Sequence, residues 1–202
     1  PRYTSYPTAA QFHEGVGAAE QAQALAAIPV GAPVSLYLHV PFCRQICWYC
    51  GCNTGVAAND RLKRYEKALL AEIAMVASLM KGRVIAVQFG GGSPNALAAP
   101  VLARIIAALR AQFDVADGTE IAMELDPRAI QPGDAKVLAA AGVNRISLGV
   151  QTFAPARVCA HTHARAHTHT CVCAHTHVCA HTRARMRVRR REHTHTHTCV
   201  CV

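Results

Sequence analysis

Four cysteines stand close together between residues 43 and 52, and their type and spacing could hold a metal. Cys43, Cys47, Cys50 and Cys52 follow the pattern C-x3-C-x2-C-x-C. Clustered thiolates bind zinc or iron–sulfur clusters. The two C-x2-C pairs common in zinc sites are not present. The first three cysteines can instead bind three irons of a [4Fe–4S] cluster from one loop, which leaves the fourth iron open to a small molecule.

Two alternatives for these cysteines are a zinc site that includes Cys52 and disulfide bonds. No charged segment followed by an apolar one opens the sequence, as a secretory signal would. We therefore expect a reducing, cytoplasmic compartment. There, clustered cysteines bind metals or act in catalysis more often than they pair.

Three further stretches carry candidate binding residues. The first is a glycine-rich run, GGGSP at residues 90–94, which lacks the Gly-Lys-Ser/Thr of a phosphate-binding loop. Glycines at a strand end let a ligand approach the backbone closely. The other candidates are Glu124 with Asp126, and Gln151. Taken singly, each also has a structural explanation: a tight turn, a solvated carboxylate or a polar residue at the end of a strand.

Alternating strands and helices must position these residues. Apolar periodicity predicts strands at 34–40, 84–89, 119–125 and 143–150, and helices at 60–80, 96–113 and 132–141, with a short helix at 18–27. Such alternation indicates a parallel sheet. The candidate residues fall at or just after the carboxyl ends of strands, where α/β proteins carry their active sites. Tyr37 and His39 share one face of the first strand, although lone residues of these types more often pack than bind ligands.

Five sequence blocks together resemble a known family. In chain order they read PRYTSYPTA, LYLHVPFCRQICWYCGCN, FGGGSP, MELDPR and NRISLGVQTF. They resemble the oxygen-independent coproporphyrinogen III oxidases, a branch of the radical S-adenosylmethionine (SAM) enzymes, over residues 1 to about 153. The first block and the Gly51-Cys52 extension argue against a related heme chaperone. That chaperone and a non-functional fragment with a metal-sequestering tail remain the alternatives.

The resemblance implies two cofactors, a [4Fe–4S] cluster and SAM. By position it makes Cys43, Cys47 and Cys50 the cluster ligands, while Cys52 belongs to the pattern without being a ligand. It implies that SAM is contacted by Tyr37, Tyr49, Gly91, Gly92, Ser93, Glu124 and Gln151.

The reaction implied by the resemblance is the oxidative decarboxylation of coproporphyrinogen III to protoporphyrinogen IX. A radical derived from SAM takes a hydrogen from a propionate side chain, and loss of carbon dioxide leaves a vinyl group. An electron donor for the cluster is the partner implied beside the substrate, and we expect a monomer.

The net charge of +9 does not indicate a nucleic-acid partner. Residues 1–156 hold 13 Lys/Arg and 11 Asp/Glu, whereas residues 157–202 hold 8 Arg and 1 Glu. The excess therefore belongs to one unusual segment. No apolar run approaches the ~18 residues of a membrane span, so we also expect no membrane partner.

That segment alternates two residue classes from 157 to 188 and again from 193 to 202. Odd positions hold Arg, Cys or His, and even positions hold Val, Ala, Thr or Met. DNA in which pyrimidines and purines alternate strictly encodes this pattern, so we interpret the segment as translated simple repeat. A very long strand and a His/Cys metal-binding tract are the other interpretations.

The sequence therefore predicts an α/β fold, a partial (βα) radical SAM barrel with about four parallel strands. We expect an N-terminal extension at 1–33, the partial core at 34–153 and an irregular or disordered tail at 154–202. An incomplete barrel should leave a strand edge and an apolar sheet face uncovered. The tail leads us to expect a truncated reading frame. The resemblance implies two more strands, further SAM contacts and a C-terminal domain that this sequence does not show, so we expect the 202-residue chain to be inactive alone.

Overall fold

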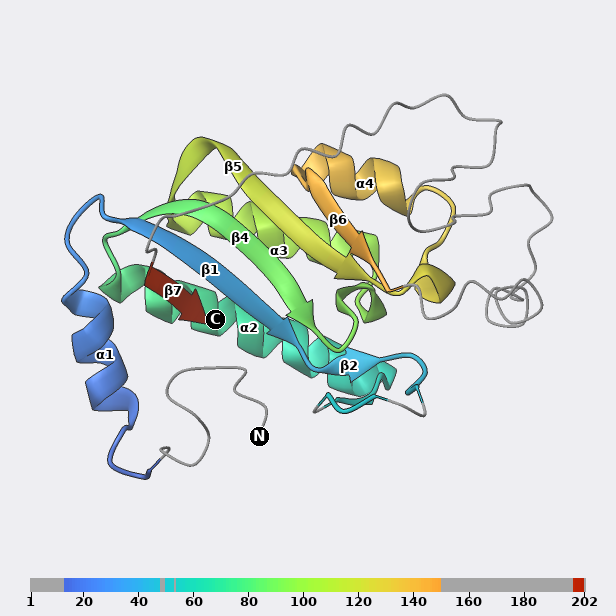
Figure 1. Ribbon diagram of the computed structural model, residues 1–202, viewed down its shortest axis with the longest axis horizontal. Coiled ribbons are helices and arrows are strands. Elements are labelled where there is room, and N and C mark those ends of the chain that lie inside the picture. Colours follow the sequence, from blue (N-terminus) through green and yellow to red (C-terminus); the bar gives the residue numbers. More distant parts are fainter. Residues whose placement is uncertain (1–12, 48–49, 53, 150–197, 202) are drawn as a thin grey trace.

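The computed structural model describes residues 13–47, 50–52, 54–149 and 198–201 (Figure 1). Helices and strands alternate along most of this range. The elements are α1 (Ala18–Ala26), β1 (Pro33–Val40), β2 (Phe42–Cys43), β3 (Gly55–Val56), α2 (Asn59–Leu79), β4 (Arg83–Gly91), the 3-10 helix η2 (Pro94–Ala96), α3 (Ala99–Gln112), β5 (Asp114–Leu125), the 3-10 helix η3 (Pro127–Ala129), α4 (Asp134–Ala141), β6 (Arg145–Leu148) and β7 (Thr198–Cys201).

The main sheet is parallel and has the strand order β6-β5-β4-β1-β7. The predicted α/β class and the four predicted strands are confirmed. The fifth strand, β7, comes from the tail and pairs with residues 34–37 of β1. We expected an irregular or disordered tail, and this strand is a regular piece within it. Thr and Val, which occupy every second position of β7, favour an extended strand. Residues 154–197 and 202 lie outside the described residues.

Helices α2 and α3 cover one face of the sheet, behind the strands in Figure 1. Alternate residues of β1 point into this layer, and four of them are at most 1% exposed: Val34, Leu36, Leu38 and Val40. Helix α2 meets them with an apolar stripe of Leu69, Ile73 and Val76, which are the buried residues of that helix. Each such side chain stabilises the fold by roughly 1.5–3 kcal/mol.

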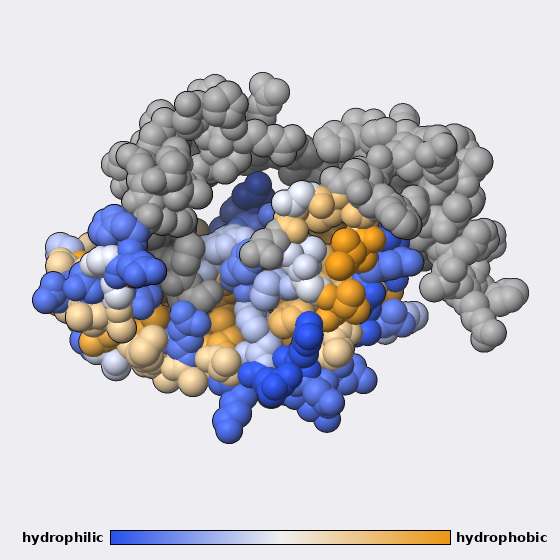
Figure 2. All heavy atoms as spheres, turned by 90° about the horizontal axis from the view of Figure 1, so that it is seen from below, coloured by the Kyte–Doolittle hydropathy of each residue, from blue (hydrophilic) through white to orange (hydrophobic). Residues whose placement is uncertain are grey.

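The opposite face of the sheet is polar, so the expectation of an uncovered apolar face is wrong. Tyr37, His39, Gln88 and Glu124 are partly or fully exposed there, while their apolar neighbours along the strands lie under the helices. The alternation of β1 accounts for much of the difference, because successive side chains of a strand point to opposite faces. Figure 2, seen from below and not onto this face, shows hydrophobic groups interspersed with hydrophilic residues on the described part of the surface.

The element bounds differ from the predicted ones at two strands and at two helix starts. The predicted strand 119–125 begins earlier, at Asp114 of β5, and within the described residues the predicted strand 143–150 is Arg145–Leu148 of β6. The predicted helix 96–113 begins at Ala99, because Pro94–Ala96 forms a separate 3-10 turn and Pro100 occupies the first turn of α3. The predicted helix 132–141 begins at Asp134, after Gly133 in a left-handed conformation. No helix among the described residues has the length and apolar character needed to cross a membrane.

Candidate functional site

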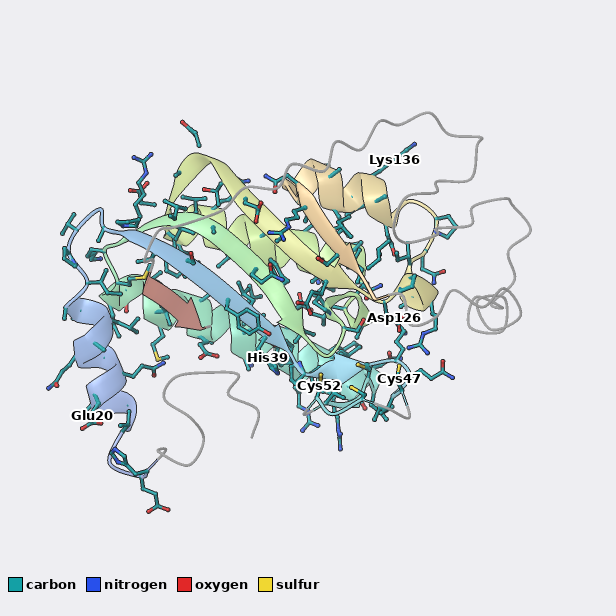
Figure 3. All side chains as sticks on the ribbon, in the orientation of Figure 1. Glu20, His39, Cys47, Cys52, Asp126 and Lys136 are labelled. Atoms are coloured by element: carbon teal, nitrogen blue, oxygen red, sulfur yellow. The ribbon has the colours of Figure 1, made fainter. Side chains whose placement is uncertain are left out.

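The loop that carries the four cysteines leaves the carboxyl end of β1 and is closed at its base. Strands β2 and β3 pair there in parallel, and the Ala57 N–H donates to the Cys43 carbonyl at 2.9 Å. Inside the loop, the Cys50 N–H donates to the Cys47 carbonyl at 3.0 Å. All four cysteines are free thiols. Figure 3 places Cys47, Cys52, His39 and Asp126 at the same end of the sheet.

The cysteine sulfurs have different surroundings. Cys43 Sγ accepts a hydrogen bond from Thr54 Oγ1 at 3.3 Å, and Cys47 Sγ accepts one from Arg128 Nη2 at 3.5 Å. Cys50 is hydrogen-bonded to Cys52 and raises the pKa of the Cys52 thiol, first through that bond and then through its charge.

The thiols do not gather around a single point. Among the described residues, no three His, Cys, Asp or Glu side chains are grouped as one metal ion requires. A four-thiolate zinc site is therefore not preformed. A [4Fe–4S] cluster does not need such a grouping, because each of its cysteines binds a different iron. Three free cysteines on one short loop fit that donor set.

The glycine-rich run is the surface against which the cysteine loop packs. Gly92 N–H donates to the Val40 carbonyl and Ser93 N–H to the Phe42 carbonyl, both at 2.8 Å. A Cβ on Gly92 would lie 2.7 Å from Phe42 O and 2.8 Å from Thr54 Oγ1. Gly91 has φ +111°, which disfavours any other residue. A Cβ on Gly91 would instead meet His39 and the Val40 carbonyl of β1. The ligand contact that the sequence suggested for these glycines stays a prediction.

Tyr37 lies near this run, on the polar face of β1. Its hydroxyl is 3.3 Å from His39 Nδ1, and a Cβ on Gly90 would lie 2.9 Å from that hydroxyl. Tyr65 of α2 donates a hydrogen bond to the His39 carbonyl. Burial raises the pKa of Tyr65 to about 12. Glu124 of β5 accepts a 3.5 Å hydrogen bond from Gln88 Nε2 and is otherwise on the open face.

Asn95 is a buried residue that the sequence did not single out. Its side chain accepts from the Asp126 N–H at 2.9 Å and donates to the Asp126 carbonyl at 2.8 Å. It also accepts a 2.7 Å hydrogen bond from the Ser93 hydroxyl. Asn95 thereby fixes the glycine-rich run against the end of β5. Nothing in the periodicity marks it, because its partner Asp126 lies 31 residues further along the chain, just after β5.

Arg128 is the second residue that the sequence missed. Asp126 accepts hydrogen bonds from the backbone N–H and the guanidinium of Arg128, and the ion pair is 2.7 Å long. This partner raises the pKa of Arg128, which stays charged. The sequence Asp126-Pro127-Arg128 could have indicated this contact, because an Asp side chain often accepts a hydrogen bond from the backbone N–H two residues further along.

The structure brings most of the predicted site residues to the end of the sheet where the parallel strands have their carboxyl ends. Tyr37, Gly91, Gly92, Ser93 and Glu124 lie at or near the carboxyl ends of β1, β4 and β5, beside the cysteine loop. Ser93 is buried, and its N–H and hydroxyl are both engaged within the protein. Tyr49 and Gln151 lie outside the described residues.

Known proteins are similar to this chain in sequence. The chain is 48% identical over 159 residues to an oxygen-independent coproporphyrinogen III oxidase of Bradyrhizobium diazoefficiens, covering 77% of this chain and 35% of that relative. It is 42% identical over 155 residues to the enzyme of the same name from Escherichia coli, covering 76% of this chain and 34% of the relative. The chain thus spans about a third of the length of these curated relatives.

A solved structure and a family model agree with these similarities. The structure of coproporphyrinogen III oxidase (HemN) from Escherichia coli, described as a radical SAM enzyme, superposes with a TM-score of 0.70 at 39% identity, covering 77% of this chain and 37% of the other. The model of the radical SAM superfamily matches residues 37–176, beyond residue 153, where we expected the resemblance to end. A radical SAM domain in general implies a [4Fe–4S] cluster and SAM. Because the matched range exceeds half of the sequence, this chain belongs to the radical SAM superfamily.

Proposed function

We propose that the cysteine loop binds a [4Fe–4S] cluster through Cys43, Cys47 and Cys50. The observation that carries the proposal is the position of three free thiols with C-x3-C-x2-C spacing at the end of β1, against the glycine-rich run. Cys52 stands outside the C-x3-C-x2-C spacing, so we do not assign it as a ligand. The fourth iron then remains open.

SAM is the ligand proposed for that open position. The residues that we assign to it are Tyr37, Tyr49, Gly91, Gly92, Ser93, Glu124 and Gln151. Support comes from the polar face on which Tyr37 and Glu124 lie, next to the cysteine loop. Glu124 offers a carboxylate to the ammonium or hydroxyl groups of SAM, and Gln88 holds one of its oxygens. Ser93 rests on the resemblance alone, because its polar groups already have protein partners.

The substrate class that we propose is coproporphyrinogen III, decarboxylated to protoporphyrinogen IX. The names of the relatives that share 42–48% identity support it. When bound and reduced by an electron donor, the cluster supplies the electron that cleaves SAM. The chain's own residues hold the thiols at the sheet edge and present a polar surface on which a ligand can be oriented. Among the described residues no further strand pairs with β6, and we expect no substrate turnover from this polypeptide alone.

The test begins with anaerobic reconstitution of the 202-residue chain with iron and sulfide. After reduction and addition of SAM, we expect 5′-deoxyadenosine and methionine to be released. Glu124→Ala should remove at least nine-tenths of this release. Glu120→Ala is the matched control, because Glu120 is an exposed carboxylate of the same strand that pairs with Arg145 at 2.8 Å. Equal release by the two variants would contradict the assignment of Glu124.

Coproporphyrinogen III is then added to the same mixture. We expect SAM cleavage without protoporphyrinogen IX from this polypeptide alone. Tight heme binding without SAM cleavage would instead favour the heme-carrying relatives and would refute the proposed reaction.

A further inference from the structure

Two arginines connect the cysteine loop to the ends of neighbouring elements. Arg44 donates to the Ala96 carbonyl of η2 at 3.3 Å. Arg128 reaches the loop from η3, with its guanidinium 3.4 Å from Gln45 Oε1 and 3.5 Å from the Gln45 carbonyl. Its Nη2 also lies 3.5 Å from Cys47 Sγ. Cys47 is thus contacted by a cation from another element, η3.

Hydrogen bonds to Asp126 fix the orientation of the Arg128 side chain. Asp126 Oδ1 accepts from Arg128 Nε and from its backbone N–H, both at 2.9 Å, and Oδ2 accepts from Nη2 at 2.7 Å. The side chains of this pair are only 23% and 14% exposed, for Arg128 and Asp126 respectively. The backbone of Asp126 is itself held by buried Asn95. A fork with two bonds to a carboxylate retains its geometry better than a surface ion pair.

We propose that Arg128, held by Asp126, is a positioning residue for Cys47. Arg128 connects the cysteine loop to the end of β5, and it donates a charge-assisted hydrogen bond to the Cys47 sulfur. The second half of this inference rests on the proposed function, in which Cys47 is a cluster ligand. Hydrogen bonds and positive charge at a ligand sulfur stabilise the reduced, more negative cluster. Arg128 therefore makes the cluster easier to reduce.

The first experiment uses the chain without a cluster. Amide hydrogen exchange is measured at Cys50 and Ala57, whose N–H groups form hydrogen bonds that close the loop. Arg128→Gln should speed exchange at both amides by at least tenfold, and Arg128→Lys should fall between it and the wild type. Arg104→Gln is the matched control, because Arg104 forms a similar 2.6 Å ion pair with Glu66, away from the loop. Equal exchange rates of these two amides in Arg128→Gln and Arg104→Gln would overturn the proposed connection between Arg128 and the cysteine loop.

The second experiment uses the reconstituted chain. The midpoint potential of the cluster is measured by a redox titration followed by electron paramagnetic resonance. We expect a more negative potential in Arg128→Gln, partial recovery in Arg128→Lys, and no change in Arg104→Gln. An unchanged or higher potential in Arg128→Gln would overturn the hydrogen bond to Cys47. Failure of every variant and of the wild type to take up a cluster would refute the proposed function, while the exchange experiment would still decide the connection between Arg128 and the cysteine loop.

Discussion

Gly92 lies where the cysteine loop crosses the end of β4, and the space beside it is already filled. A methyl group there would meet the Phe42 carbonyl oxygen, a backbone atom that cannot rotate away. Gly92→Ala should therefore cost about 1–3 kcal/mol in the free energy of unfolding, measured by urea denaturation. Gly51→Ala is the control within the same loop, because nothing lies within 4 Å of its added Cβ. Equal stability of the two variants would contradict this packing.

Tyr65 gives a pH-dependent prediction. Burial raises its pKa from 10.0 to about 12 in the folded chain, so the folded state retains the phenol proton to higher pH than the unfolded state. The stability that this supplies is complete below pH 10.0 and is lost as the pH rises towards about 12. Tyr65→Phe should be less sensitive to pH across this window, as measured by thermal unfolding. An identical pH slope in the variant and the wild type would contradict the assignment.

At the scale of elements, the strands and helices that position the site follow from apolar periodicity. The stripe of α2 and the alternation of β1 are local patterns, and both match the buried residues. The side-chain contacts that join one loop to another do not follow from these local patterns. Asn95 and Arg128 act on partners 31 and 81 residues away, and no local pattern encodes such contacts. The cysteine spacing was readable because its members share one loop.

Asn95 permits a test of the connection between two elements. Asn95→Ala would remove three hydrogen bonds, two of them to the backbone of Asp126, in a residue that is 7% exposed. We expect a loss of roughly 2–3 kcal/mol in the free energy of unfolding, since buried polar groups would lose their partners. Asn59→Ala, at an exposed asparagine, should change stability by less than about 0.5 kcal/mol. A similarly small loss for Asn95→Ala would show that Asn95 is dispensable.

At the scale of the whole molecule, the described sheet has two different edges. β7 pairs with β1 at one edge, and β6 at the other has no further strand among the described residues. The exposed strand β6 carries Ile146, which is 40% exposed. The half of the site built by β1, β4 and β5 is nevertheless internally connected. Cluster binding is therefore expected from this chain, whereas substrate turnover is not.

Cluster ligation is the central claim, and one measurement tests it most directly. Iron and acid-labile sulfide are determined in the anaerobically reconstituted chain and in four single Cys→Ser variants, alongside its electron paramagnetic resonance spectrum after reduction. We predict that Cys43→Ser, Cys47→Ser and Cys50→Ser lose the cluster, while Cys52→Ser retains it. Retention of the cluster in any of the first three variants, or its loss in Cys52→Ser, would contradict the account.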